Sequence, residues 1–296
     1  PVAVGDRVVV IAAGGACGRC YACHVLRAPG RCTERPGRAV LETTAGARVH
    51  VFGGGYAEYV RLDPPGYVML RTDLDPRSAV LLEPLSNPIN GLERTPVRLG
   101  DTVVIQGCGG IGLPALIVAR LSGALRTIVV GGPAGRLALA REYGADACID
   151  IADVPDPADR IRAVRSATPH GLGADLVIGA TGVAATVTEG IEYLRDRGQL
   201  CEIGNATDSG DTPFSPFRHL VRKRAVVVGV GGTEVRHYVL ALRVLEKGGF
   251  AFHKMVSHTL PLDRVGEGIA ALSGGYRIDG RDTIKIAVAP NGDPAA

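Results

Sequence analysis

Residues 102–113 read Thr-Val-Val-Ile-Gln-Gly-Cys-Gly-Gly-Ile-Gly-Leu. The β-branched run is typical of a strand, and the apolar run that follows the glycines predicts a helix. Gly107, Gly109 and Gly112 fit G-x-G-x-x-G in the strand-then-helix setting where that pattern indicates dinucleotide binding. These glycines would permit a tight turn, a close approach to a pyrophosphate, and close packing of helix on strand. The N-terminus of the helix would hold the phosphates. In a chain with 41 glycines, a loop that binds nothing is the alternative.

The chain beyond this loop alternates between predicted strands and helices. Strands are expected at 102–106, 127–131, 147–151, 175–178, 199–203 and 225–230. Helical patterns lie between them, near 111–121, 134–143, 157–166, 184–196 and 215–222. This alternation predicts an α/β fold with a parallel, doubly wound sheet. It is the context that the glycine motif requires, so we predict a dinucleotide-binding (Rossmann) domain.

Composition and charge exclude several other classes of protein. A length of 296 residues allows one large or two medium domains. No apolar run reaches the ~18 to 20 residues of a membrane span. The net charge of +3 is spread along the chain and there is no tryptophan. We therefore expect neither a nucleic-acid nor a membrane partner.

Four of the seven cysteines lie close together near the N-terminus. Cys17, Cys20, Cys23 and Cys32 form C-x2-C-x2-C-x8-C. Clustered thiolates repel one another and need a cation, so we predict a structural zinc with all four positions filled by cysteine. Unligated thiols and a redox C-x-x-C are the alternatives, and His24 is a possible substitute ligand. With no secretory segment visible, we expect a reducing, cytoplasmic environment.

Three further predictions concern single cysteines and local secondary structure. Cys108, Cys148 and Cys201 lie in or beside predicted strands, and we interpret them as core packing. Residues 78–92 are expected to be helical, with a kink or a break caused by Pro84 and Pro88. Alternation before residue 61 predicts a hairpin that ends in a strand at 57–60.

Taken together, the motifs resemble the zinc-dependent medium-chain alcohol dehydrogenase family, near its sorbitol and threonine dehydrogenase branch. The matching segments run through nearly the whole chain in family order. They are Gly5-Asp6-Arg7-Val8, the four-cysteine lobe, residues 54–60, Glu83-Pro84-Leu85-Ser86, the glycine loop, residues 136–137 and 143–146, residues 173–175 and 180–182, and residues 258–262.

This resemblance implies a fold, a domain division and a reaction. The fold would be a Rossmann sheet inserted in a co-chaperonin-like β-barrel catalytic domain. The barrel would comprise residues 1–86, with the zinc lobe at 14–38, and residues 253–296, and the dinucleotide-binding domain would comprise residues 87–252. The reaction would be hydride transfer between an alcohol or polyol carbon and NAD or NADP, with a catalytic zinc as Lewis acid.

Members of the family carry a cysteine and a Gly-His-Glu segment upstream of the Gly-Asp-Arg-Val element, and neither lies in this sequence. We therefore expect the chain to be an N-terminally truncated piece of a longer protein that cannot complete the catalytic zinc site. Glu83 is the one catalytic candidate left. By resemblance it would ligate that zinc or lie just behind it, and the alternative is a capping or surface carboxylate.

Two smaller departures from the family pattern concern the zinc lobe and the cofactor. The spacing between the third and fourth cysteines is one residue longer than usual, which a loop can absorb. Gly131 stands where NAD-preferring members have an acidic residue that binds the adenosine ribose. With Arg136 five residues further on, this favours NADP or dual use, although a solvated helix arginine is the alternative.

The resemblance also assigns further cofactor contacts, partners and alternatives. Gly110 and the backbone of Ile111 would lie at the pyrophosphate, and Ile203, Gly204 and Asn205 beside the nicotinamide ribose. The partners would be a small alcohol or ketone and further copies of the chain, in a homodimer or homotetramer joined through its nucleotide-domain sheets. Alternatives are a zinc-independent NADPH quinone or enone reductase of the same fold, a zinc-ribbon nucleic-acid binder, and an inactive fragment.

Overall fold

The computed structural model describes residues 2–12, 16–34, 40–42, 48–50, 55–60, 62 and 67–292. The chain forms two compact units, and each is described by itself. The first comprises Pro1–Val80, Glu234–Val239 and Val256–Ala296 in their described parts. The second comprises Leu81–Thr233 and Leu240–Met255.

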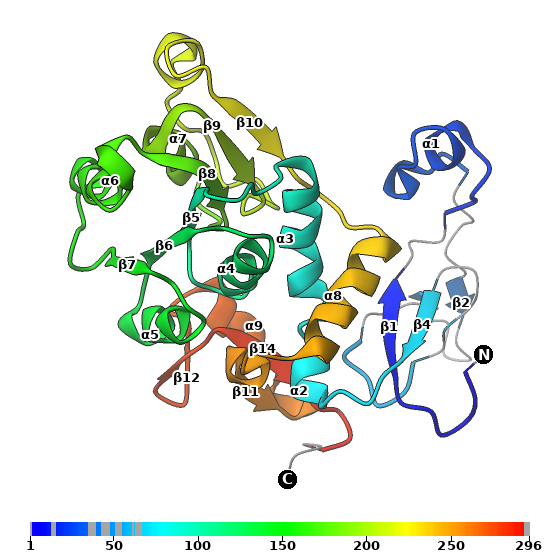
Figure 1. Ribbon diagram of the computed structural model, residues 1–296. Helices are drawn as coiled ribbons and strands as arrows, with labels where there is room; N and C mark the ends of the chain where they lie inside the picture. The colour runs from blue at the N-terminus through cyan, green and yellow to red at the C-terminus, as the bar shows by residue number, and fades with distance from the viewer. Residues whose placement is uncertain are drawn as a thin grey trace. The chain divides into compact units, whose positions relative to one another are not determined.

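The second unit is built on a parallel sheet of six strands (Figure 1). The strands are β5 (Thr102–Gln106), β6 (Arg126–Gly131), β7 (Ala147–Asp150), β8 (Ala174–Gly179), β9 (Leu194–Glu202) and β10 (Val226–Gly229). Their order across the sheet is β10-β9-β8-β5-β6-β7, and every pairing is parallel. The predicted doubly wound sheet is confirmed. The order of the strands reverses between β5 and β8, the point where such folds bind ligands beyond the carboxyl ends of their strands.

Helices connect the strands and cover the sheet (Figure 1). They are α3 (Leu82–Arg94), α4 (Gly112–Leu121), α5 (Ala134–Glu142), α6 (Pro157–Ser166) and α7 (Ala185–Tyr193). After β10 comes α8 (Val235–Lys247), whose residues up to Val239 belong to the first unit and whose residues from Leu240 on belong to the second. Local sequence explains where they begin. In α6, Asp156 accepts hydrogen bonds from the N–H groups of Ala158 and Asp159, and Pro157 occupies the first turn, where its missing N–H costs nothing.

The core of this unit lies around β5. Val103, Val104 and Ile105 are completely buried because helices cover both faces of the sheet. Residues 112–119 of α4 are also buried, so this helix is apolar on all sides. Full burial of each large aliphatic side chain contributes about 1.5–3 kcal/mol. The sheet therefore owes its stability to apolar burial.

One local expectation is confirmed and two differ from the structure. The helical segment expected at 78–92, with a kink or a break, is two helices, α2 (Pro76–Ala79) and α3, and the break falls before Pro84, which lies in the first turn of α3. β9 begins at Leu194 instead of 199, with a register shift against β8. The strand expected at 57–60 is wrong, because residues 57 and 58 form a bend and residues 59 and 60 have no regular secondary structure.

The first unit consists of short elements that pair two by two in its described parts. β1 (Val8–Ala12) pairs with β4 (Tyr67–Arg71), β2 (Val40–Glu42) with β3 (Arg48–His50), β11 (Val256–Leu260) with β14 (Lys285–Val288), and β12 (Arg277–Ile278) with β13 (Arg281–Asp282). The helices are α1 (Tyr21–His24), α2 and α9 (Val265–Ser273). In the described part of the chain, no helix combines the length and apolarity that a membrane span needs.

Candidate functional site

The glycine loop forms a tight turn between β5 and α4. Gly107 has φ +96°, and its N–H donates to the Val130 carbonyl at 2.7 Å. A Cβ atom on Gly107 would lie 2.8 Å from the Ala180 carbonyl oxygen. A Cβ on Gly112 would lie 1.9 Å from the carbonyl oxygen of Gly107. Both positions therefore require glycine, one for the turn and one for the close approach of the helix to the strand.

The top of this loop offers main-chain donors to a ligand. The N–H groups of Gly109, Gly110 and Ile111 donate no hydrogen bond to any described part of the chain. They precede α4, whose dipole adds positive potential at its N-terminus. A Cβ on Gly109 would meet one atom within 4 Å, the Arg136 Nη1 at 3.7 Å. The space over Gly109 is open, as a diphosphate bound to these amides would require.

The loops after β8 and β9 lie close together at the same edge of the sheet. The Ile203 N–H donates to the Gly179 carbonyl at 2.9 Å. A Cβ on Gly204 would lie 2.3 Å from the Thr181 carbonyl oxygen, so this position also requires glycine. Both loops follow the carboxyl ends of neighbouring strands of the sheet. The family resemblance predicts the nicotinamide ribose beside residues 203–205.

Glu202, at the end of β9, is a site residue that sequence reasoning missed. Its Oε1 accepts hydrogen bonds from the N–H groups of Gly204 (2.8 Å) and Asn205 (3.0 Å) and from the Asn205 side-chain amide (3.1 Å). Glu202 thereby holds the 203–205 turn in place. It also lines a hollow of about 410 Å³ with Asn205 and Ala184. The sequence did contain a signal for it, because the charged Glu202 directly follows the apolar residues Leu200 and Cys201 of a predicted strand.

At the end of β6, packing explains why this chain has Gly131 at the position that is acidic in NAD-preferring members of the family. A Cβ on Gly131 would lie 2.8 Å from the sulfur of Cys108. Cys108 is 2% exposed and its Sγ lies 3.4 Å from the Gly132 carbonyl oxygen. Burial raises the pKa of the Cys108 thiol to about 11, so the thiol stays neutral. Its position confirms the interpretation of Cys108 as core packing, and Gly131 makes room for that packing.

The four cysteines of the N-terminal lobe converge as predicted. Their sulfur atoms all lie within 4.8 Å of one another. The Sγ of Cys20 is 3.4 Å from that of Cys23 and 3.9 Å from that of Cys32. Main-chain N–H groups also point at the sulfurs, from Cys17 to the Cys32 Sγ and from Cys20 to the Cys17 Sγ, both at 3.3 Å.

The electrostatics of the cluster favour thiolates that a cation would neutralise. Main-chain N–H groups of Thr33 and Cys23 lower the pKa of Cys20 to about 5. The Cys17 N–H lowers the pKa of Cys32 in the same way. Burial and the neighbouring sulfurs raise the pKa of Cys23 to about 12, because a further negative charge is unfavourable there. A divalent cation would remove that penalty.

Zinc fits this donor set. Four sulfurs at about 2.3 Å from a tetrahedral zinc lie about 3.8 Å apart, close to the observed separations. In the described residues these cysteines are the one group of three or more His, Cys, Asp or Glu side chains that could hold a metal ion. His24 is exposed and outside the group. All four positions of the metal would be filled by protein, so the site is of the structural kind.

Glu83, the remaining catalytic candidate, lies in the first turn of α3 in the second unit. Its side chain is exposed, and its Oε1 accepts a hydrogen bond from the Asn87 side-chain amide at 2.9 Å. The carboxylate can stabilise the N-terminus of its own helix. Its predicted role at a catalytic zinc stays a prediction.

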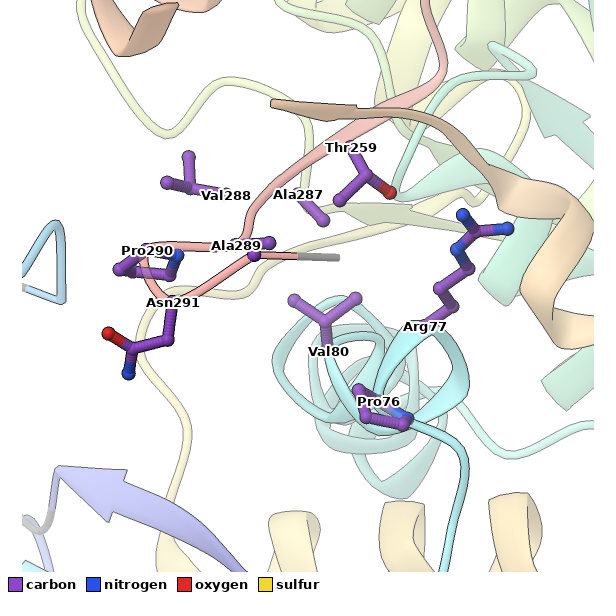
Figure 2. Close-up of a pocket in the computed structure, with 10 residues that line it drawn as sticks. Pro76, Arg77, Val80, Thr259, Ala287, Val288, Ala289, Pro290 and Asn291 are labelled. Atoms are coloured by element: carbon purple, nitrogen blue, oxygen red, sulfur yellow. The ribbon is translucent and has the colours of Figure 1, made fainter. Parts of the chain in front are cut away.

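A second pocket lies in the first unit, away from any predicted site residue. It has a volume of about 290 Å³ between α2 and the ends of β11 and β14. Figure 2 shows Arg77 and Val80 on the α2 side and Thr259 and Ala287 on the strand side. The lining is mostly apolar, and Arg77 is the charged side chain among its residues. It brings together no group of catalytic side chains.

Comparison with known proteins points to one family of dehydrogenases. Residues 110–247 match the family described as zinc-binding dehydrogenase. The chain is 28% identical to a sorbitol dehydrogenase of Halalkalibacterium halodurans over 97% of its own length and 77% of the relative's. An alcohol dehydrogenase structure from Thermotoga maritima superposes with a TM-score of 0.80 at 28% identity, covering 96% of this chain and 76% of that one.

A structure described as a zinc-binding dehydrogenase from Sinorhizobium meliloti, bound to NADP, superposes with a TM-score of 0.78 at 26% identity. It covers 98% of this chain and 78% of that one. The family match begins inside the glycine loop, and the structural matches span both the sheet and the cysteine lobe. Residues 110–247 of this chain therefore carry the sequence of the zinc-binding dehydrogenase family.

Proposed function

We propose that this chain is a zinc-containing, NAD(P)-dependent alcohol or polyol dehydrogenase that transfers a hydride between an alcohol carbon and the cofactor. The observation that carries the proposal is the row of unpaired main-chain amides at Gly109, Gly110 and Ile111, placed at the switch point of a doubly wound sheet. Its kinship with sorbitol and alcohol dehydrogenases supplies the class of reaction.

Different loops of the second unit would bind different parts of the dinucleotide. The amides of 109–111 bind the diphosphate, with Gly107 and Gly112 shaping the loop. Arg136, whose Nη1 lies near Gly109, adds positive charge there. Gly131 borders the adenosine ribose. Ile203, Gly204 and Asn205, held by Glu202, border the nicotinamide ribose. The nicotinamide, when bound, accepts or returns the hydride.

The zinc held by Cys17, Cys20, Cys23 and Cys32 would stabilise the lobe and leave no position for a substrate. We propose Glu83 as a ligand of a separate catalytic zinc, or as a residue just behind it. Its exposed carboxylate and its place in the family-like segment Glu83-Pro84-Leu85-Ser86 support this role. When bound, a catalytic zinc would supply Lewis-acid chemistry to a small alcohol or ketone.

We further propose that the chain forms homodimers or homotetramers in the cytoplasm. β10 is the last strand in the order of the sheet, and no described strand pairs with its outer edge. Val226 and Val227 on this strand are 49% and 40% exposed. An apolar strand edge of this kind favours pairing with a second copy. The clustered, unpaired cysteines suit a reducing compartment.

A zinc-independent quinone or enone reductase is the second candidate, and the cysteine cluster counts against it. Zinc analysis and dinucleotide titration of the purified chain distinguish the zinc-containing dehydrogenase from the zinc-independent reductase. We expect about one zinc per chain and saturable binding of NADH or NADPH. Gly109→Val should weaken dinucleotide binding by about 50-fold or more, because its side chain fills the open space over the amides.

Gly135→Ala is the matched control for this substitution. Gly135 lies in α5, and a Cβ there would meet no atom within 4 Å. This variant should bind dinucleotide like the parent chain. A zinc-free chain that still binds NADPH would favour the reductase. A Gly109→Val chain that folds and binds normally would exclude the proposed cofactor site.

A further inference from the structure

We propose that Asp150, at the end of β7, selects NAD(H) over NADP(H). The carboxylate that the end of β6 lacks would thus come from the neighbouring strand. This inference rests on the proposed function, since it concerns the adenosine end of the same cofactor site. It also reverses the preference for NADP or dual use that Gly131 and Arg136 suggest in the sequence.

The register of the sheet brings Asp150 to the end of β6. Gly131 pairs directly with Asp150, and the Ile151 N–H donates to the Gly131 carbonyl at 2.9 Å. A Cβ built on Gly132 would lie 3.3 Å from the Asp150 Oδ1. The carboxylate therefore stands beside Gly132, one residue after the position whose acidic side chain contacts the ribose hydroxyls in NAD-preferring proteins.

The carboxylate has capacity left for a ligand. Its Oδ1 accepts a hydrogen bond from the Ala152 N–H at 2.9 Å, which orients the group. The described residues supply no hydrogen bond to Oδ2 and no ion pair to the carboxylate. Asp150 is half-buried, so its charge is less screened than that of a fully exposed acid. Oδ2 can accept hydrogen bonds from ribose hydroxyls.

Arg136 is the nearby positive charge. Its Nη1 lies 3.7 Å from the position of a Cβ on Gly109, over the diphosphate end of the site. The diphosphate is common to NAD and NADP, so attraction by Arg136 at that end does not distinguish them. Asp150 is the negative charge that a 2′-phosphate would meet at the end of β6.

Titration of the full chain with NADH and NADPH tests this assignment. We expect NADH to bind about 30-fold more tightly than NADPH, because the 2′-phosphate is repelled by Asp150. Asp150→Asn keeps the size of the side chain and the acceptor for Ala152 but removes the charge. It should reduce the preference to about threefold or less, mainly through tighter NADPH binding.

Asp153→Asn is the control, because Asp153 is an exposed acid three residues further on. It removes the same charge and should leave the preference unchanged. A second measurement needs no variant. Raising the salt concentration should narrow the preference of the parent chain, since screening weakens the repulsion.

Each alternative result has a distinct meaning. If the parent chain binds NADPH as tightly as NADH, or if the two asparagine variants behave alike, Asp150 has no such role. If Asp150→Asn weakens both dinucleotides equally, the carboxylate contacts a part that both share, and the inference is wrong. If the parent chain binds neither dinucleotide, the proposed function fails together with this inference.

Discussion

The glycine loop and the cysteine lobe reach order by opposite physical means. All five residues of β5, the strand before the loop, are buried. At Gly107 and Gly112 the main chains approach so closely that there is no room for a side chain. In the lobe, the described residues 16–34 include two buried residues, Cys20 and Ala22. The sheet is held by apolar burial, and the lobe by sulfur atoms that converge on one point. We therefore expect a metal ion to stabilise the lobe, in the way that the apolar core stabilises the sheet.

The two regions should be destabilised by different kinds of substitution. A region held by burial is damaged by an added or removed carbon atom, because cores are close-packed. A region held by a metal is damaged by the loss of one ligand atom, even when the shape of the side chain is kept. The two regions should therefore fail independently.

Gly112→Ala should have the largest effect. Its Cβ would lie 1.9 Å from the Gly107 carbonyl oxygen, a main-chain atom that cannot move without shifting β5 or α4. We expect a loss of more than about 4 kcal/mol in the free energy of unfolding of the sheet unit, together with loss of dinucleotide binding. Denaturant unfolding measures the first. A stable variant with parental affinity would show that the loop adapts and that the comparison is wrong.

Cys20→Ser should come next and should act on the other region alone. The variant keeps the size of the side chain but replaces a thiolate ligand. We expect the zinc content to fall from about one per chain to nearly none, with rapid hydrogen exchange in residues 16–34. Dinucleotide affinity should stay within about twofold of the parent value. His24→Ala serves as the control and should retain zinc, whereas equal loss from both variants would contradict the ligand set.

The smallest effect concerns the alkaline pH dependence of the sheet unit. The pKa of Cys108 is about 11 in the folded chain, above that of an exposed thiol. The folded state therefore holds its proton more tightly than the unfolded state. The resulting stabilisation is fully present below about pH 8.5 and is lost as the pH rises to about 11, by about 3 kcal/mol at most.

Cys108→Ala isolates this contribution. Its unfolding free energy should fall less steeply than that of the parent chain between pH 8.5 and 11. Equal slopes in the two chains would show that the Cys108 thiol is not held neutral by burial. Cys148→Ala is a useful companion, because burial also raises the pKa of the half-buried Cys148 thiol.

Much of the fold and of the candidate site could be predicted because the signals are local. The glycine spacing at 107–112 and the cysteine spacing at 17–32 each lie within one short segment, and the structure places both as expected. The family is also confirmed. Other predictions failed where distant contacts decide the outcome. β9 begins five residues early because Leu194 pairs with Ala174 of β8, across a register shift from the next pair, Leu176 with Gln199. Residues 57–60 do not form the expected strand.

The sequence by itself determined the alternation of strands and helices, the tight turn at Gly107 and a four-thiol metal site, because spacing along the chain sets each of them. Only the tertiary structure decided that Gly131 makes room for Cys108, that Gly204 lies against Thr181, and that Asp150 stands beside Gly132. The physical reason is that strand order and register bring together atoms from segments far apart in the chain. The composition and periodicity of the sequence do not indicate which distant atoms will lie close together in the fold.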